Sequence, residues 1–325
     1  YLPGSDDLQL IDPVLTQELN YSGNLAFEIP PGHPFRDKIQ PLTSEFFVYQ
    51  NGEEIFRGRN IGTEEDFYKR REIDCEGDLA YLLDSIQRPF DHTGSVEDFF
   101  TARLSDHNSQ EPRKQFKKGI VNVAAASVQR VADTCETTLN CLKNQLIGSH
   151  KGYLRTRLHN GERYLDYVID YGGYNSQPIR FRENLLALNR KRDVTTLRTA
   201  IIPYGAMVEV ANPDGTTSSK RVGITSVNGG KDYIFNQEAV NKYGWFMANV
   251  IFDEVTDPET LKRTAEAYLE DVVQLPDTLE LTAIDLSLVD ADIASLKIGY
   301  WTRVVSEPHN LKGEYLLTKK VIHLT

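Results

Sequence analysis

Two strand-like runs on either side of Asn51-Gly52 constrain the fold of this chain more than any other local feature. Residues 44–50 and 54–59 flank this dipeptide and are rich in Phe, Val, Ile and Tyr. Asn and Gly both tolerate positive φ, which a type I′ turn requires at its two central positions. The pattern therefore predicts an antiparallel hairpin over residues 44–59.

Other segments of the first 86 residues also have the character of strands. Residues 24–29 alternate apolar and polar side chains, which is the period of a half-buried strand. Residues 8–11 and 70–76 are further strand candidates, and a cluster of prolines between residues 30 and 34 interrupts regular structure. We expect residues 1–86 to form a small antiparallel barrel or sandwich.

The next part of the chain, residues 87–177, carries mainly helical signals. Ser95 and Asp98 resemble a capping box at the start of one helix. Thr134 is expected to cap another helix, with Gly148 as its end. The preceding residues 77–85 predict a short helix, and two strand-like runs around Asn160-Gly161 predict a second hairpin, so a mixed α/β region is expected here.

Residues 178–325 return to strands around a helical insertion. A Gly- and Tyr-rich stretch at residues 171–178 marks the boundary, and Asp257-Pro258 is a strong helix start because Asp caps and Pro suits the first helical position. The insertion is expected at about residues 230–275, with a turn at 212–215. The strands are predicted at residues 195–204, 280–288, 300–305 and 315–324.

Composition narrows the class of protein. The net charge is −11, from 36 basic and 47 acidic residues, so the surface repels nucleic acid and anionic lipid at long range. Three scattered cysteines do not form a disulfide framework and suit a reducing cytoplasm. No apolar run is long enough to cross a bilayer, and the first residues do not look like a signal peptide, so we expect no membrane insertion.

The usual signatures of catalysis and metal binding are missing from the sequence. None of the seven histidines lies three or four residues from another His or Cys, and no Gly-x-Ser-x-Gly elbow, His-Glu-x-x-His or phosphate loop occurs. Cys135 and Cys141 have no usual zinc spacing, and both are expected to pack as small apolar residues of a helix. The sequence therefore predicts no catalytic, cofactor-binding or metal-binding residues and no cofactor.

Two further groups of residues have a structural and a functional interpretation. Cys75 is a candidate nucleophile, but Asp74 and Glu76 beside it raise a thiol's pKa, which favours a structural role. The basic clusters 69–71 and 190–192 could hold phosphate, but in an acidic chain salt bridges are the favoured interpretation.

Short sequence words occur in a fixed order along the chain. They are Asn20–Pro34, Ile55–Arg59 (IFRGR), Asp74–Ser85, Glu183–Leu186, Ile202–Ala206 and Ile298–His309. In this order the words resemble the phage minor structural proteins of siphophage tail tips, the tail-associated or prophage endopeptidase tail family, which is similar to the baseplate hub of contractile tails. The resemblance runs from about residue 10 to 325, and Tyr300 stands where the family usually has Asp.

The resemblance implies an α+β, β-rich fold with two tail-tube-like antiparallel β-barrels and a peripheral α/β domain. Residues 1–86 would form the first barrel, residues 87–177 the peripheral domain, and residues 178–325 a second barrel interrupted by the insertion. Three chains with two barrels each would close a six-fold tube end, because closed cyclic symmetry stops growth. An acidic lumen would let DNA slide without sticking.

The function that the resemblance implies is structural, with no enzyme activity within this chain. It implies a homotrimeric hub at the virion tail tip that contacts a distal tail protein, a tape measure protein and a receptor-binding protein, with a channel for transient DNA passage during genome ejection and host cell attachment. A lysin domain, where a family member has one, would lie beyond residue 325. A cell-wall hydrolase or peptidase and a carbohydrate-binding adhesin are the alternatives.

Overall fold

The contacts within the chain divide it into two compact units. The computed structural model describes residues 8–324 except 124–127, 193, 212–215, 254, 274–276 and 291. Unit 1 consists of Tyr1–Asn184 with Ile284–Thr325, and unit 2 is Leu185–Ala283. The two domain boundaries predicted after residues 86 and 177 both fall inside unit 1. The division of unit 1 into smaller domains at these residues remains a prediction.

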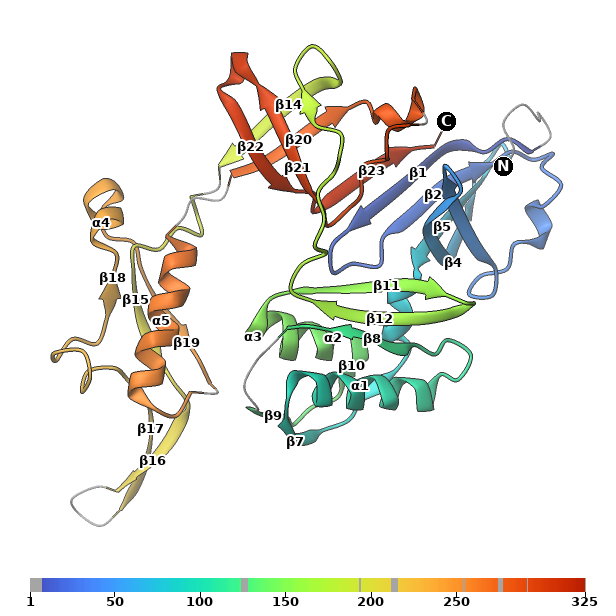
Figure 1. Ribbon diagram of the computed structural model, residues 1–325. Coiled ribbons are helices and arrows are strands. Elements are labelled where there is room, and N and C mark those ends of the chain that lie inside the picture. The colour runs from blue at the N-terminus through green and yellow to red at the C-terminus, as the bar shows by residue number, and fades with distance from the viewer. Residues whose placement is uncertain are drawn as a thin grey trace. The chain divides into compact units, whose positions relative to one another are not determined.

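A six-stranded antiparallel sheet brings the two ends of the chain together in unit 1 (Figure 1). Its order is β23-β1-β2-β5-β4-β3, so the last strand of the chain pairs with the first. Leu15 lies opposite Ile322 in this pairing, which the sequence did not indicate. The strands are β1 (Ile11–Glu18), β2 (Asn24–Ile29), β3 (Glu45–Gln50), β4 (Glu53–Glu65), β5 (Arg71–Gly77) and β23 (Lys319–His323), with a 3₁₀ turn η2 (Arg36–Lys38) after β2.

The predicted hairpin over residues 44–59 is confirmed as β3 and the first half of β4. Asn51 and Gly52 have φ of 52° and 79°, the type I′ conformation. Alternate residues of the strands point to one face and form its core, which consists of Leu15, Leu25, Phe27, Ile29, Phe56, Ile73 and Cys75.

Helices and short strands form a second core in unit 1. The capping box predicted at Ser95 and Asp98 is confirmed and begins α1 (Val96–Gln110). Phe99 and Phe100 of α1 are fully buried in this core together with Leu142 and Tyr167. The other elements are η3 (Asp78–Leu83), β6 (Ile86–Gln87), β7 (Phe90–Gly94), β8 (Lys117–Val121), β9 (Val128–Ala132), β10 (Glu136–Thr137), α2 (Thr138–Leu142), the π-helical turn η4 (Lys143–Ile147), α3 (Gly148–His150), β11 (Tyr153–His159) and β12 (Glu162–Val168).

The hairpin around Asn160-Gly161 is confirmed, but the prediction for the preceding helix is wrong at both ends. Thr137, not Thr134, caps α2, because Glu136 and Thr137 pair with β6 as a short strand before the helix starts. The helical path continues past Gly148 to His150, and the chain turns at Lys151 with φ of 60°.

The remaining strands of unit 1 form a three-stranded sheet of order β13-β21-β22. The fold is mostly β, as predicted, and each sheet within the described residues is open. The elements are β13 (Ile179–Arg180), η5 (Leu286–Leu288), β21 (Trp301–Ser306), η6 (Glu307–His309) and β22 (Leu311–Leu316).

Unit 2 is a small α/β unit in which one helix packs on one sheet. The apolar stripe of α5, Leu261, Ala265 and Leu269, packs with Ile201 and Ile234 of the sheet β18-β15-β19. The predicted cap and proline start of α5 are confirmed. The elements are β14 (Leu185–Arg192), β15 (Ala200–Tyr204), β16 (Met207–Ala211), β17 (Thr217–Arg221), β18 (Ile234–Phe235), α4 (Gln237–Tyr243), β19 (Met247–Ile251), α5 (Pro258–Val272) and β20 (Asp277–Ala283).

Three sequence predictions for unit 2 have different outcomes. The strand expected over residues 195–204 starts only at Ala200, because Val194–Leu197 forms a hydrogen-bonded turn. The turn predicted at 212–215 and residues 274–275 at the end of the predicted insertion lie outside the described residues. The insertion expected at about 230–275 contains α4 and α5, but also the strands β18 and β19.

Candidate functional site

A buried Ser–His pair joins the end of η3 to α1, and no sequence motif indicates it because its members are 22 residues apart. Ser85 Oγ lies 2.7 Å from His107 Nδ1, and Thr138 Oγ1 lies 2.6 Å from Ser85 Oγ. His107 Nε2 lies 3.1 Å from the carbonyl of Lys114 instead of a carboxylate. All three side chains are almost inaccessible to solvent, so the cluster holds the helical layer together and is closed to substrates.

A second Ser–His pair ends β21. Ser306 Oγ lies 2.6 Å from His309 Nδ1. Ser306 is buried, whereas His309 is exposed. In the described part of the chain no carboxylate is hydrogen bonded to His309, so the third member that orients the base in a nucleophilic triad is missing from this arrangement.

The three thiols have different environments. Cys75 and Cys141 are buried, and burial together with the nearby Asp74 and Glu136, respectively, raises the pKa of each thiol to about 12. Cys135 is exposed and precedes the helix, so the expectation that it packs as an apolar helix residue is wrong. Among the described residues no group of three or more His, Cys, Asp or Glu side chains could hold a metal ion.

Two of the sequence segments that carry the family resemblance contribute side chains to one ion network. The network lies between the six-stranded sheet and the second core of unit 1. Arg59 of the IFRGR word is buried and donates to Asp84 Oδ1 at 2.8 Å and to Glu76 Oε1 at 2.8 Å. Lys114 adds a contact of 3.0 Å to Asp84. Burial by itself would raise the pKa of Asp84, but the hydrogen bonds from Arg59 and Lys114 outweigh it and lower that pKa. This network fixes the sheet on the layer beneath it.

Acidic side chains gather on the face of the six-stranded sheet that points away from its core. Glu28, Glu72 and Glu64 lie directly opposite one another on the neighbouring strands β2, β5 and β4. Asp74 follows Glu72 on the same face of β5. These four residues are called the acidic face below. Arg70 approaches Glu28 at 3.5 Å, while in the described part of the chain Glu64, Glu72 and Asp74 have no ion pair.

Like charges directly opposite one another destabilise a sheet. The acidic face therefore makes the fold less stable than a face with neutral residues or with charges of both signs. Alternation in β5, where Glu72, Asp74 and Glu76 are separated by Ile73 and Cys75, was the sequence signal that could have located it.

The two edges of the six-stranded sheet are unpaired within the described residues. One edge is β3, which exposes Phe47 and Tyr49, and the other is β23, which exposes Val321. Unpaired N–H and C=O groups at such edges can bind a strand of another chain.

Two of the three residues of the basic cluster 69–71 form salt bridges, the interpretation that the sequence favours. Arg70 binds Asp66 at 2.9 Å, and Arg71 lies 3.4 Å from Glu65. The cluster 190–192 is part of β14.

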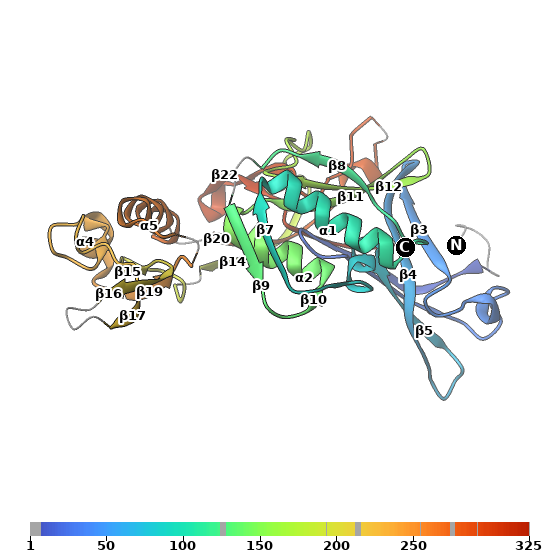
Figure 2. The same cartoon turned by 90° about the horizontal axis from the view of Figure 1, so that it is seen from below.

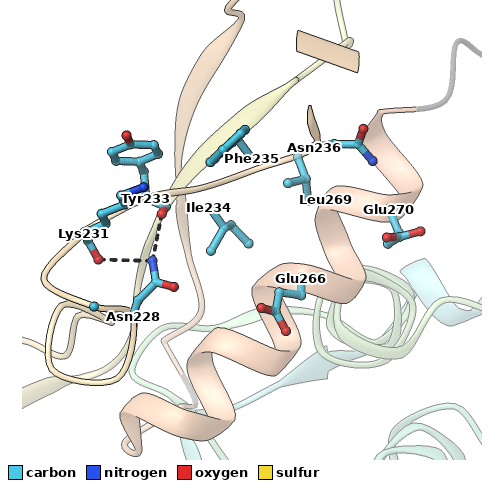
Figure 3. A pocket seen from close by; sticks show the side chains of 10 residues that line it. Asn228, Lys231, Tyr233, Ile234, Phe235, Asn236, Glu266, Leu269 and Glu270 are labelled. Carbon is cyan, nitrogen blue, oxygen red and sulfur yellow. Dashed lines mark hydrogen bonds between the residues drawn. The ribbon is translucent and has the colours of Figure 1, made fainter. Parts of the chain in front are cut away.

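Unit 2 has a shallow pocket between α5 and the loop before β18 (Figure 3). Its volume is about 450 Å³, and Asn228 shapes its loop by donating to the carbonyls of Lys231 and Tyr233. Glu266 and Glu270 of α5 line the opposite side. Next to it, Trp245 is half exposed and its ring lies 5.3 Å from Phe235 and 6.0 Å from Tyr233. Aromatic rings beside carboxylates and amides can bind polar ligands that have an apolar face.

No helix in the described part of the chain is long and apolar enough to span a bilayer.

Comparison with known proteins agrees with the sequence words. Residues 174–320 match the model of the family described as prophage endopeptidase tail. A search of curated proteins finds no match to this chain.

Solved structures share the fold across almost the whole chain. The prophage tail protein gp18 of Listeria monocytogenes EGD-e covers 98% of this chain and 86% of its own, with a TM-score of 0.57 at 16% identity. The 43 kDa tail protein of prophage MuSo2 from Shewanella oneidensis covers 96% and 90%, with a TM-score of 0.65 at 14% identity. A tail protein of Neisseria meningitidis MC58 covers 96% and 87%, with a TM-score of 0.66 at 11% identity.

Proposed function

We propose that this chain is a prophage tail protein of the prophage endopeptidase tail type and that three copies of it form the hub that closes the tail tube at its tip. The hub carries two tube-like modules per chain, one built on the six-stranded sheet and one on β13, β21 and β22. Three chains then supply six modules, which matches the six-fold symmetry of a tail tube. Distal tail, tape measure and receptor-binding proteins are its neighbours.

The observation that carries this proposal is the pair of open edges on one sheet. In a ring of six modules, an edge of this sheet in one copy meets a different surface of the next copy, so the contact is heterologous. Heterologous contacts generate rings when the rotation between copies closes. Pairing also covers two edges that would otherwise promote aggregation.

Edge-blocking substitutions test the ring. Phe47→Lys and Val321→Lys place a charge at each edge, and we expect each to shift the purified protein from trimer to monomer in light scattering coupled to size-exclusion chromatography. Ile169→Lys is the matched control, because Ile169 is 50% exposed and lies outside both edges. The hub would be contradicted if the purified wild-type protein stays monomeric at all concentrations and is also present as a single copy in isolated tails.

The acidic face supports a channel for DNA within this ring. A duplex carries a negative charge about every 1.7 Å, so a lumen lined by Glu28, Glu64, Glu72 and Asp74 keeps the DNA from binding to the wall. Such a role explains why repulsion within the sheet is retained.

Charge reversal tests the channel separately from the ring. We expect Glu64→Lys/Glu72→Lys to leave the trimer of the purified protein intact but to make it bind short duplex DNA at low salt. The control Glu209→Lys/Glu238→Lys makes the same charge change on β16 and α4. If both double variants bind DNA equally, the acidic face has no special place in the lumen.

The hub requires no enzyme activity from this chain, and among the described residues the Ser85–His107 pair is buried while the Ser306–His309 pair lacks an orienting carboxylate. Purified protein incubated with peptidoglycan should release no fragments. Turnover that Ser306→Ala or His309→Ala abolishes would favour the hydrolase alternative instead.

The aromatic cluster of unit 2 favours carbohydrate binding as a second candidate function. Sugars stack on exposed aromatic rings, and Trp245 beside the pocket offers such a ring. Binding of bacterial cell-wall polysaccharide by wild type but not by Trp245→Ala would support it, and equal binding by both would refute it.

A further inference from the structure

We propose that the tip of the β4–β5 hairpin, Phe67 and Tyr68, is an aromatic anchor that inserts into an apolar pocket of a different protein stacked on the ring. Figure 2 shows this hairpin projecting from the rest of the sheet. The evidence that the hairpin tip is a binding surface comes from the hairpin itself. The position of its partner along the axis of the tail rests on the proposed ring.

The exposure of the two rings is the first observation. Phe67 is 93% exposed and Tyr68 is 72% exposed, and Phe67 is the most exposed of the large hydrophobic side chains that the structure describes. The rings lie 5.3 Å apart in an edge-to-face arrangement. Adjacent aromatic residues at a projecting point resemble the anchors that dominate binding energy at protein interfaces.

The tip is rigid before any partner binds. Asp66 accepts hydrogen bonds from the Arg70 backbone at 2.7 Å and from Arg70 Nε at 2.9 Å, and the Asp66 N–H donates to the carbonyl of Arg70 at 3.0 Å. Lys69 adopts the left-handed conformation with φ of 60° and donates its N–H to the carbonyl of Asp66. A loop fixed in this way loses little conformational entropy on docking.

The base of the hairpin is braced as well. Arg36 is buried and binds Glu65 at 2.6 Å, and Arg71 donates to the carbonyl of Arg36 at 2.8 Å. The two basic residues that follow Lys69 are therefore committed to holding the hairpin.

The chemistry around the rings points to a protein partner. Glu64 and Glu72 lie opposite each other behind the tip without ion pairs in the described part of the chain, and Arg70 and Arg71 are already neutralised by Asp66 and Glu65. Lys69 is the one cation of this tip without an ion pair among the described residues, and the two carboxylates outnumber it, so an anionic lipid surface or a nucleic acid would be repelled. An apolar pocket with a basic rim complements both the rings and the two free carboxylates.

Strand geometry indicates that the partner of the tip is a different protein and not a second copy of this chain. Pairing with β3 reaches only to Arg59 on β4, so the hairpin continues beyond that edge strand. When strands pair edge to edge into a closed barrel, they run at about 35–45° to its axis and their ends form the rim. Neighbouring copies then occupy the edges, and the rim faces the next protein along the tail.

The experiment uses the full chain expressed from the prophage in place of the wild-type gene. A photo-crosslinking phenylalanine analogue at position 67 should form, in isolated tails, a covalent product with a tail protein other than this chain, identified by mass spectrometry. Crosslinks only to another copy of this chain, or none in assembled tails, would overturn the proposal.

Paired variants separate the anchor from the fold and from the ring. Phe67→Ser/Tyr68→Ser should unfold at the same temperature and keep the oligomeric state of the wild type, yet reduce incorporation into tails about 100-fold or more, the loss expected for truncating two anchors. Phe67→Tyr/Tyr68→Phe keeps the aromatic area and should be incorporated normally.

The remaining outcomes test the anchor and the hub separately. If the serine variant dissociates the ring, the tip is a contact between copies and the proposal is wrong. If it is incorporated normally, no anchor exists there. If the wild type forms no ring but position 67 still crosslinks to another tail protein, the hub fails and the anchor stands.

Discussion

The ring of Tyr300 lies directly over Gly173, so that a Cβ added at Gly173 would sit 2.2 Å from Tyr300 Cε2. The relationship is reciprocal, because a Cβ at Gly299 would sit 2.1 Å from Tyr171 Cδ2. The Trp301 N–H donates to the Gly173 carbonyl at 3.0 Å between these two contacts. Tyr300 thus joins the boundary segment, residues 171–178, to β21.

Gly173→Ala should destabilise unit 1 by about 1–3 kcal/mol, because the ring of Tyr300 must move to admit the new methyl group. Urea unfolding followed by tryptophan fluorescence measures the loss. Gly32→Ala is the matched control, since a Cβ there meets nothing within 4 Å. In a double-mutant cycle Gly173→Ala should cost little in a Tyr300→Ala background, and an unchanged cost would disprove the contact.

The stability of the protein should fall as the pH drops below 6.5, partly through His107. Burial lowers the pKa of His107 from its ordinary 6.5, so the unfolded chain binds a proton that the folded chain resists. Stability from this source is complete above pH 6.5 and is lost as pH falls towards the folded pKa.

His107→Gln should lower the free energy of unfolding at pH 8 by about 1–2 kcal/mol and make it less dependent on pH between 6.5 and 5. The remaining dependence comes in part from His33 and His150, whose pKa values burial also lowers. The exposed His159 provides the control substitution. An identical pH slope in His107→Gln and wild type would show that His107 does not titrate in this way.

Only one of the three thiols should react quickly. At pH 8 a chromogenic disulfide reagent should label Cys135 within minutes, while Cys75 and Cys141 react only on unfolding because they are buried and their thiol pKa values are about 12. Cys135→Ser should abolish the fast phase. Two or three fast equivalents in the native protein would contradict the burial of the other two.

Unit 1 should fold without unit 2. The chain leaves unit 1 after Asn184 and re-enters at Ile284, and the Ile284 N–H donates to the Asn184 carbonyl at 2.9 Å. The buried Asn184 side chain also accepts from the Arg180 N–H at 2.8 Å. A short Gly-Ser linker in place of residues 185–283 can therefore close the gap at small entropic cost.

Circular dichroism and urea unfolding check this deletion. We expect a soluble protein with one cooperative transition. A matched variant with Asn184→Ala in the deleted chain should be less stable by about 1–3 kcal/mol, since buried backbone groups lose their partners. Aggregation of the deleted chain would show that unit 2 is needed for unit 1 to fold.

Local chemistry was sufficient to predict the elements whose geometry depends on neighbours in sequence. The turns at Asn51-Gly52 and Asn160-Gly161 and the caps at Ser95 and Asp257 form as expected, because positive φ and capping hydrogen bonds involve only adjacent residues. Thr134 and Thr137 could both cap a helix on local grounds. Only the pairing of Glu136 and Thr137 with β6 selected the second.

The sequence by itself determined a β-rich chain with hairpins and capped helices, because alternation, turn residues and capping motifs are properties of short segments. Tertiary structure alone decided that β23 completes the first sheet, that Arg59 meets Asp84, and that Glu28, Glu72 and Glu64 form one acidic face. These features depend on strand order and register between segments up to about 300 residues apart, since a shift of one residue would turn every side chain of a strand to the other face.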